Sequence, residues 1–340
     1  MRWSVATCTN TGVRTPHWLQ TTPTWHASGA TPYRPGLQTA IQGWSGDGRI
    51  HFNSRPGPGT TFGAYSALPD GSDLRAWLEL PGQHVGLGNT TADGHHAIAS
   101  ISRPGAAGAS AEPGRGVNND LWLIRDDGQS WQLTFGKDSG LALIWPMLNH
   151  DGSKVCFATC YYPAGLNVFE ALGYWKLMTA KINYDSHMLT GLSDVTPVPK
   201  KFYETYGWDA KGRLLFASDV NKLWVLASQI WVMNEDKSGL TQVSAPASSA
   251  YCEFSQQLPD GAYVYCTGNK AANKGMDHWV RPAGPAGTAY KLTSQSAVQP
   301  AHPMATSFAI EPGGKRMVAT YIADASSEDL VATMFTLTKK

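Results

Sequence analysis

Short alternations of apolar and polar residues punctuate this chain, and each is interrupted by a tight turn that contains glycine. The pattern returns at intervals of roughly fifty residues, and a fixed period of this kind is typical of a repeat architecture. It covers residues 44–52, 90–100, 149–159, 207–218, 258–267 and 311–320. Asp-Gly between alternating apolar residues is a strong hairpin signal, because both turn residues can take positive φ. Each occurrence therefore predicts a β-hairpin.

Two further strand signals follow most hairpins. The third strand of a unit reads NDLWLIRDDGQ from Asn119, for example, and QIWVMNEDKSG from Gln229. A fourth, short strand often ends in a pair such as Leu133-Thr134 or Leu292-Thr293. One four-stranded sheet of this size cannot bury both of its faces, so the units must stack. Repeated four-stranded units predict a β-propeller.

We therefore predict an all-β fold, a six-bladed β-propeller with four-stranded antiparallel blades in a single domain over residues 1–340. The expected blades are 39–80, 85–134, 141–196, 203–244, 251–293 and 304–338. The last unit lacks a fourth strand, and residues 17–21 copy the spacing of the other fourth strands. This N-terminal strand is expected to complete the sixth blade. Residues 3–9 are also strand-like and leave a seventh, degenerate blade as the alternative.

Composition excludes several classes of partner. The formal charge is +1 and only 16% of residues are charged, so no basic stripe indicates nucleic acid and no charged patch indicates a membrane surface. No run of eighteen apolar residues predicts a transmembrane segment. Low charge with many Trp and Gly residues favours an extracytoplasmic protein, periplasmic or secreted. The start at Met1 shows no signal-peptide pattern, so the compartment stays open.

Five cysteines leave the redox state open. Cys252 and Cys266 flank the turn at 258–261 almost symmetrically, which allows either two packed thiols or a cross-strand disulfide. No CxxC spacing indicates a zinc or redox site.

The repeat unit resembles the TolB-like branch of WD40-like propeller repeats. The shared features are an aromatic residue, Ser, Asp-Gly and a Phe, followed by an apolar strand and Leu-Thr, and they extend over residues 33–338. Related repeats occur in TolB, in peptidase propeller domains and in oligogalacturonate lyases. The repeat is a packing unit, so the resemblance implies a fold rather than a chemistry.

In propellers the hairpin turns between first and second strands lie on one face, and ligands usually bind at the opposite face, around the channel mouth. His95, His96 and His150 lie at hairpin turns and are therefore expected to face away from a ligand site. The opposite connections supply the expected ligand-binding residues Arg34, His84, Lys201, Glu204, Trp224, Gln299 and His302.

The oligogalacturonate lyases hold a divalent metal with a Gln-x-x-His-x-His cluster, and Gln299 and His302 resemble its first two members. Met304 stands where the second His would be and is a poor ligand for a hard cation. We predict no cofactor and keep a divalent metal at Gln299 and His302 as the alternative. A lyase would act by β-elimination on a uronic acid, with His302, Tyr203 or Lys200 as base.

Two hypotheses follow from the sequence. The first is a non-catalytic propeller that binds a protein or glycan ligand at the channel mouth. The alternative is a sugar-active enzyme, a polysaccharide lyase that acts on oligouronates. No G-x-S-x-G, HExxH or P-loop motif is present, so whether the chain is an enzyme stays open.

Overall fold

The computed structural model describes residues 25–35, 38–56, 60–102, 104, 119–136, 141–161, 175–220, 227–244, 251–268, 275–283, 287–297, 303–323 and 329–339. These residues form strands β1 to β24 and one short 3-10 helix, η5 (Gln295–Ala297). None of the helical structure in these ranges could span a bilayer.

Four of the sheets contain four antiparallel strands each, in simple sequence order. The first two are β2 (Gln38–Trp44), β3 (Ile50–Arg55), β4 (Gly63–Ala67), β5 (Arg75–Leu78), and then β6 (Val85–Thr90), β7 (His96–Ser102), β8 (Asn119–Arg125), β9 (Ser130–Gln132). The next two are β10 (Leu141–Leu148), β11 (Lys154–Tyr161), β12 (Trp175–Asn183), β13 (Met188–Asp194), and then β14 (Tyr203–Trp208), β15 (Leu214–Ser218), β16 (Gln229–Met233), β17 (Thr241–Gln242).

The remaining strands form one eight-stranded sheet. Its first run is β18 (Tyr251–Gln257), β19 (Tyr263–Gly268), β20 (Met276–Arg281) and β21 (Tyr290–Lys291). Its second run is β22 (Met304–Ile310), β23 (Arg316–Ile322), β24 (Leu330–Lys339) and β1 (Trp25–Tyr33). A single parallel residue pair, Met276 with Met304, joins the two runs.

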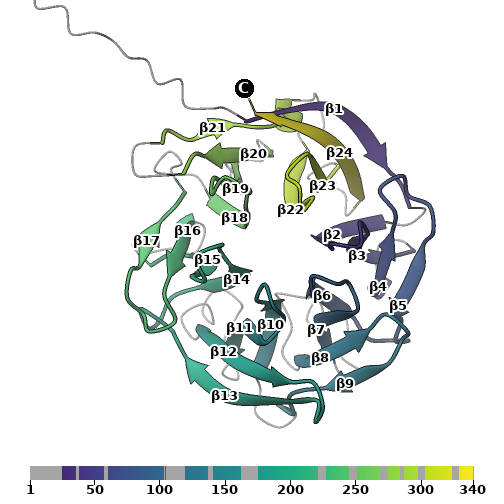
Figure 1. Ribbon diagram of the computed structural model, residues 1–340, viewed down its shortest axis with the longest axis vertical. Coiled ribbons are helices and arrows are strands. Elements are labelled where there is room, and N and C mark those ends of the chain that lie inside the picture. Colours follow the sequence, from purple (N-terminus) through teal and green to yellow (C-terminus); the bar gives the residue numbers. More distant parts are fainter. Residues whose placement is uncertain are drawn as a thin grey trace, which may run out of the picture.

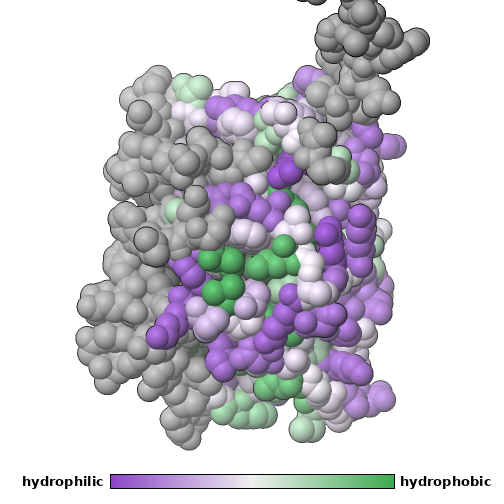
Figure 2. Space-filling model, turned by 90° about the vertical axis from the view of Figure 1, so that its left-hand side faces the viewer, coloured by the Kyte–Doolittle hydropathy of each residue, from purple (hydrophilic) through white to green (hydrophobic). Residues whose placement is uncertain are grey.

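The sheets are arranged as a ring around a central opening (Figure 1). Strands β2, β6, β10, β14, β18 and β22 lie nearest the opening, and we call them the innermost strands. The predicted all-β propeller of four-stranded antiparallel blades is therefore confirmed. Seen edge-on, the coloured surface is mainly hydrophilic, with apolar areas near its middle and along its lower edge (Figure 2).

An N-terminal strand lies on the outside of β24, as the missing fourth strand of the last repeat requires. This strand is β1, which pairs antiparallel with β24 from Trp25 opposite Lys339 to Tyr33 opposite Ala332. The residues expected in this place, 17–21, lie outside the described part of the chain. Trp25 also connects the two runs of the eight-stranded sheet, because its indole donates to Asp260 at 3.0 Å. Trp25 therefore contributes to ring closure.

The glycine turns form the expected hairpins between the first and second strands. Gly48, Gly94, Gly152, Gly212, Gly261 and Gly314 all have φ between 69° and 87°. Each glycine N–H donates to the carbonyl three residues earlier, as from Gly48 to Ser45 at 3.0 Å. Only glycine adopts this left-handed conformation without a steric cost, which explains its recurrence in the sequence.

The closing Leu-Thr pairs tie the fourth strand of a sheet to the third. Leu133 and Leu292 are 6% and 7% exposed, and each donates its N–H to a third-strand carbonyl. The hydroxyl of Thr134 accepts the Leu121 N–H at 2.9 Å and donates to Asp120. Thr293 repeats this arrangement with the His278 N–H at 3.0 Å and the Asp277 carboxylate. In each pair, the leucine is buried and the threonine hydroxyl accepts a hydrogen bond from a main-chain N–H of the third strand.

Every innermost strand contains a β-bulge near its middle. The pairing register shifts at Gln42, 88–89, 145–146, 206–207, Phe254 and 306–307. A bulge leaves main-chain groups without a ladder partner and redirects the side chains beside it. Trp145 and Phe254 adopt φ of 49° and 46°, which is rare for large side chains.

Neighbouring sheets supply hydrogen bonds to these bulged strands. The Asn53 amide of β3 donates to the Val85 carbonyl and accepts the Leu87 N–H at 3.1 Å. The Thr320 hydroxyl accepts the Ile41 N–H at 2.8 Å, and Ser100 donates to Leu143 at 2.6 Å. All three side chains are buried second-strand residues. These bonds join an innermost strand to the neighbouring sheet, and those to Ile41 and Leu87 lie directly before a bulge.

The cysteines of the eight-stranded sheet are thiols. Cys252 faces Thr267 and Cys266 faces Glu253 in the β18–β19 ladder, so the two cysteines are not opposite each other. Both are free and fully buried. The Cys266 thiol donates to the Thr306 carbonyl at a bulge, at 2.8 Å. The disulfide alternative is therefore wrong, because the turn pairs Gln257 with Tyr263 and this register does not bring the two cysteines opposite each other, even with the bulge at Phe254.

We predict that Gly88→Ala destabilises the ring. A Cβ atom at Gly88 would lie 1.8 Å from the Pro146 carbonyl oxygen, so β6 and β10 would have to separate. Overpacking of this kind costs about 1–3 kcal/mol or more. The matched control is Gly313→Ala, because a Cβ there meets no atom within 4 Å. Chemical denaturation measures both free energies of unfolding, and equal losses for the two variants would contradict the close strand contact.

We predict that stability falls on acidification because His51 and His278 are buried as neutral side chains. Burial lowers the pKa of each to about 4, whereas unfolding restores values near 6.5. Between these two pKa values the native chain binds fewer protons than the unfolded chain. The contribution of the two histidines to the free energy of unfolding is therefore fully present above about pH 6.5, and it is lost as the pH falls towards 4. His278→Gln should reduce the stability difference between about pH 7.5 and pH 5 by about 2 kcal/mol.

The exposed His26 on β1 provides the control for this pH experiment. His26→Gln should keep the pH dependence of the unmodified chain in the same denaturation series. An unchanged pH dependence in His278→Gln would show that His278 is not the group that titrates.

Candidate functional site

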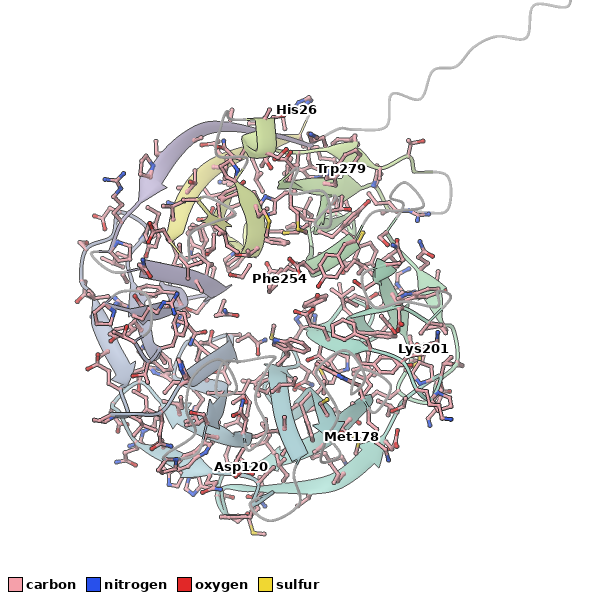
Figure 3. All side chains as sticks on the ribbon, turned by 180° about the vertical axis from the view of Figure 1, so that it is seen from behind. His26, Asp120, Met178, Lys201, Phe254 and Trp279 are labelled. Atoms are coloured by element: carbon pink, nitrogen blue, oxygen red, sulfur yellow. The ribbon has the colours of Figure 1, made fainter. Side chains whose placement is uncertain are left out.

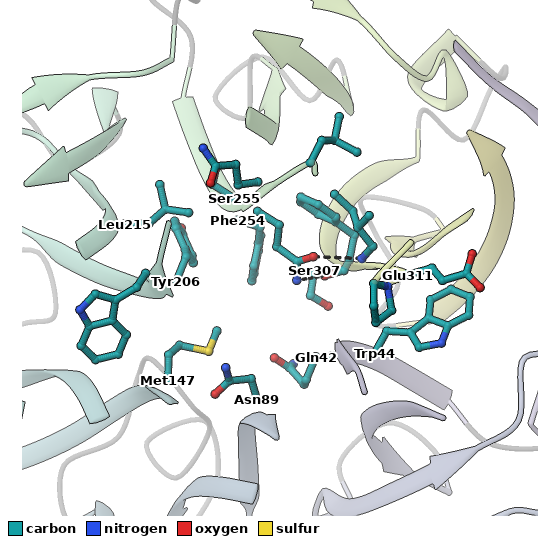
Figure 4. Close-up of a pocket in the computed structure, with 18 of the residues that line it drawn as sticks. Gln42, Trp44, Asn89, Met147, Tyr206, Leu215, Phe254, Ser255, Ser307 and Glu311 are labelled. Carbon is teal, nitrogen blue, oxygen red and sulfur yellow. Dashed lines mark hydrogen bonds between the residues drawn. The ribbon is translucent and has the colours of Figure 1, made fainter. Parts of the chain in front are cut away.

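The central channel contains a cavity of about 450 Å³ at the end that carries the hairpin turns. Its wall is built from the second halves of the innermost strands and the turns after them. Gln42, Asn89, Met147, Tyr206, Phe254 and Ser307 form a ring of side chains, one from each innermost strand (Figure 4). All six lie at a bulge or beside one. The bulges therefore shape this cavity.

The cavity wall is apolar on one side. Tyr206 and Phe254 lie on the neighbouring strands β14 and β18 with ring centroids 6.0 Å apart and planes tilted by 36°. Met147 of β10 lies next to Tyr206 in this ring. Phe254 projects into the central opening (Figure 3). Its positive φ is an unusual conformation for an aromatic residue, and such outliers cluster at binding sites.

Most polar side chains in the wall are engaged in building the ring. The Asn89 amide donates to the Leu148 carbonyl at 3.0 Å, and Gln256 donates to Phe308 and accepts from Ile310. These amides connect one innermost strand to the next. They are therefore structural and not available to a ligand.

Gln42 and Ser307 differ from these amides. Among the described residues no hydrogen bond of the Gln42 side chain is found, and the buried hydroxyls of Ser307 and Tyr206 both lack a partner. Ser307 is 5% exposed and lies on the wall of the cavity (Figure 4). A buried hydroxyl without a partner costs roughly 1–3 kcal/mol. A hydrogen-bonding ligand would remove this cost.

The histidine and the carboxylate of the wall both have partners. The His150 imidazole lies 3.2 Å from the Asp209 carbonyl oxygen. Glu311 forms an ion pair with Arg316 at 2.7 Å. The described wall thus presents no uncompensated charge to the cavity.

The position of this cavity corrects one sequence-based expectation. His150 was expected to face away from a ligand site, yet it lines the cavity at the hairpin-turn end. The connections at the other end of the channel lie largely outside the described residues. The signal that locates the ring is the interruption of first strands by Gly43, Gly88, Pro146 and Gly207, since Gly or Pro inside a strand marks a bulge.

None of the predicted ligand-binding and catalytic residues that the structure describes lines this cavity. Arg34 and Lys200 are exposed, and Figure 3 shows Lys201 distant from the central opening. His84 is half-buried and its Nδ1 is 3.3 Å from the Phe62 nitrogen. Glu204 is a buried residue of β14. Trp224, Gln299 and His302 lie outside the described residues.

Tyr203 has a structural role in the connection before β14. Its hydroxyl donates to the Val198 carbonyl at 2.6 Å and accepts the Val198 N–H at 3.2 Å. Burial raises the pKa of this hydroxyl to about 12. A phenol held in this way is a poor base near neutral pH.

The described residues contain no group of three His, Cys, Asp or Glu side chains placed to hold a metal ion. The alternative metal site at Gln299 and His302 falls outside this set and stays a prediction.

Comparison with solved structures identifies the same fold in several proteins. TolB from Acinetobacter baumannii matches with a TM-score of 0.56 at 12% identity, over 86% of this chain and 64% of that one. An oligogalacturonate lyase in complex with manganese matches with a TM-score of 0.51 at 12% identity, over 93% and 96% of the two chains. The predicted resemblance to these propellers is thereby confirmed.

A puromycin-hydrolyzing peptidase from Mycobacterium tuberculosis also matches, with a TM-score of 0.51 at 12% identity over 85% of this chain. The chain spans about half the length of such peptidases, 50% in this case. No protein-family model and no curated protein matches the sequence. At these identities the likeness establishes the propeller fold and not an activity.

Proposed function

We propose that this chain is a six-bladed binding propeller that takes a protein or glycan ligand into the hairpin-turn end of its channel. The count of six treats the eight-stranded sheet as two blades, since one residue pair joins its two runs. The observation that carries the function is the ring of six side chains around the cavity, in which the buried Ser307 and Tyr206 hydroxyls have no partner and Gln42 has no hydrogen bond to a described residue.

The chemistry of the wall supports binding over catalysis. General acid–base catalysis needs a titratable group within reach of the substrate. His150 and Glu311 line the cavity, but one contacts a carbonyl oxygen and the other is in an ion pair. An aromatic wall with a few convergent polar groups is typical of small-ligand sites, whose volumes are about 300–1,000 Å³. The cavity volume of about 450 Å³ falls in this range.

The lyase alternative depends on other residues. It needs a base and a cation site at the opposite end of the channel, where Gln299 and His302 lie outside the described residues. The matched lyase fold supports the architecture only. We therefore keep β-elimination on uronates as a sequence-based prediction.

We expect ligand binding to change the NMR signal of Met147 selectively. The chain has 9 methionines, so methyl-¹³C labelling gives few signals, and Met147→Leu assigns the one in the cavity wall. Met188, which is 59% exposed on β13, provides a reference on the outer rim. Pools of glycans and peptides are added and the methyl spectrum is recorded.

A saturable shift of the Met147 signal with an unchanged Met188 signal would support binding in the channel. Binding that shifts Met188 and leaves Met147 unchanged would contradict the proposed site. The absence of any Met147 response to either class of ligand would contradict the proposed function.

A further inference from the structure

The cavity has two chemically different sides. Gln42 on β2 and Ser307 on β22 come from adjacent strands and supply an amide and a hydroxyl (Figure 4). Met147, Tyr206 and Phe254 come from three consecutive innermost strands across the opening, and they form a mainly apolar side whose polar group is the buried Tyr206 hydroxyl. A ligand that fills the cavity must therefore present an apolar surface on one side and hydrogen-bonding groups on the other.

The charges of the wall restrict the ligand further. Among the described residues no Lys or Arg side chain lines the cavity, and the Glu311 carboxylate is paired with Arg316. Transfer of a carboxylate, phosphate or ammonium group from water into such a site would leave it without a counter-charge, which is strongly unfavourable. The ligand group in the cavity is therefore uncharged.

The free polar groups define the hydrogen bonds that the ligand must make. An amide offers both N–H donors and a carbonyl acceptor, and a hydroxyl both donates and accepts. Partners that donate and accept in turn, such as sugar hydroxyls, match both side chains. The C–H face of a pyranose is apolar and can lie against an aromatic ring, which accounts for Phe254.

We infer that the channel cavity binds an uncharged pyranose residue of a glycan, with the apolar face of the sugar on Phe254 and its hydroxyls bonded to Gln42 and Ser307. This inference rests on the proposed binding function and narrows its ligand class. A neutral peptide side chain is the competing occupant, but it offers fewer hydroxyl groups for hydrogen bonds to Gln42 and Ser307. An oligouronate is disfavoured because the described wall holds no cation for its carboxylates.

Isothermal titration calorimetry with three sets of probes tests this inference. The probes are neutral gluco-, manno- and xylo-oligosaccharides, uronate oligomers of similar length, and capped neutral peptides. At least one neutral oligosaccharide should bind saturably. Phe254→Ala, Gln42→Ala and Ser307→Ala should each weaken this binding about tenfold, because each removes a contact in the cavity.

Matched controls come from outside the cavity. Phe135 is 76% exposed and Gln129 is exposed on the β8–β9 turn, so Phe135→Ala and Gln129→Ala should leave the affinity within about twofold. Ser186, exposed on the β12–β13 turn, provides the serine control. Circular dichroism and thermal melts establish that all variants fold.

The outcomes of this experiment distinguish an error in the ligand class from an error in the proposed binding site. If no neutral oligosaccharide binds, but a uronate or peptide binds and is weakened by Phe254→Ala, the ligand class is wrong and the binding site stands. If a neutral oligosaccharide binds equally well to the three cavity variants and the controls, the inference is overturned together with the proposed site. Absence of binding by every probe also overturns the inference.

Discussion

The hydrogen bonds between a bulged innermost strand and the sheet next to it are the contacts on which this ring depends. A bulge leaves main-chain donors and acceptors unpaired within a sheet, and each such group is costly when buried. Near these bulges, Asn53, Ser100 and Thr320 of second strands form hydrogen bonds to main-chain groups of the innermost strand of the neighbouring sheet. Adjacent sheets are thus joined by directional bonds in addition to apolar packing, which fixes their relative position.

The same bulges connect the architecture to the candidate site. Regular alternation would place every second side chain of an innermost strand towards the channel, whereas an extra residue redirects the side chains beside it. Gln42, Phe254 and Ser307 are themselves bulge residues, so the bulges set the direction of their side chains. Structural amides such as Asn89 then occupy much of the polar wall, which leaves few groups for a ligand. The cavity is therefore a consequence of how the sheets are held together.

The repeats predicted the propeller, its hairpin turns and the closing Leu-Thr pairs, because these depend on local residue types. Gly48 and Thr134 perform the roles that their spacing indicated. The count of six blades and the ligand residues on the opposite face stay predictions. The cavity was missed because a bulge depends on pairing between strands, and the sequence marks it only by interruptions such as Gly88 and Pro146. Cys252 and Cys266 are not opposite each other because the hairpin turn sets a different register from the one that their spacing suggested.

A crystal structure of the chain with a neutral oligosaccharide tests the central claim most directly. The account predicts a sugar ring in the channel at the hairpin-turn end, with its apolar face on Phe254 and its hydroxyls within hydrogen-bond distance of Gln42 and Ser307. A sugar bound at the opposite face, or on the outer rim with the cavity unchanged, would contradict it.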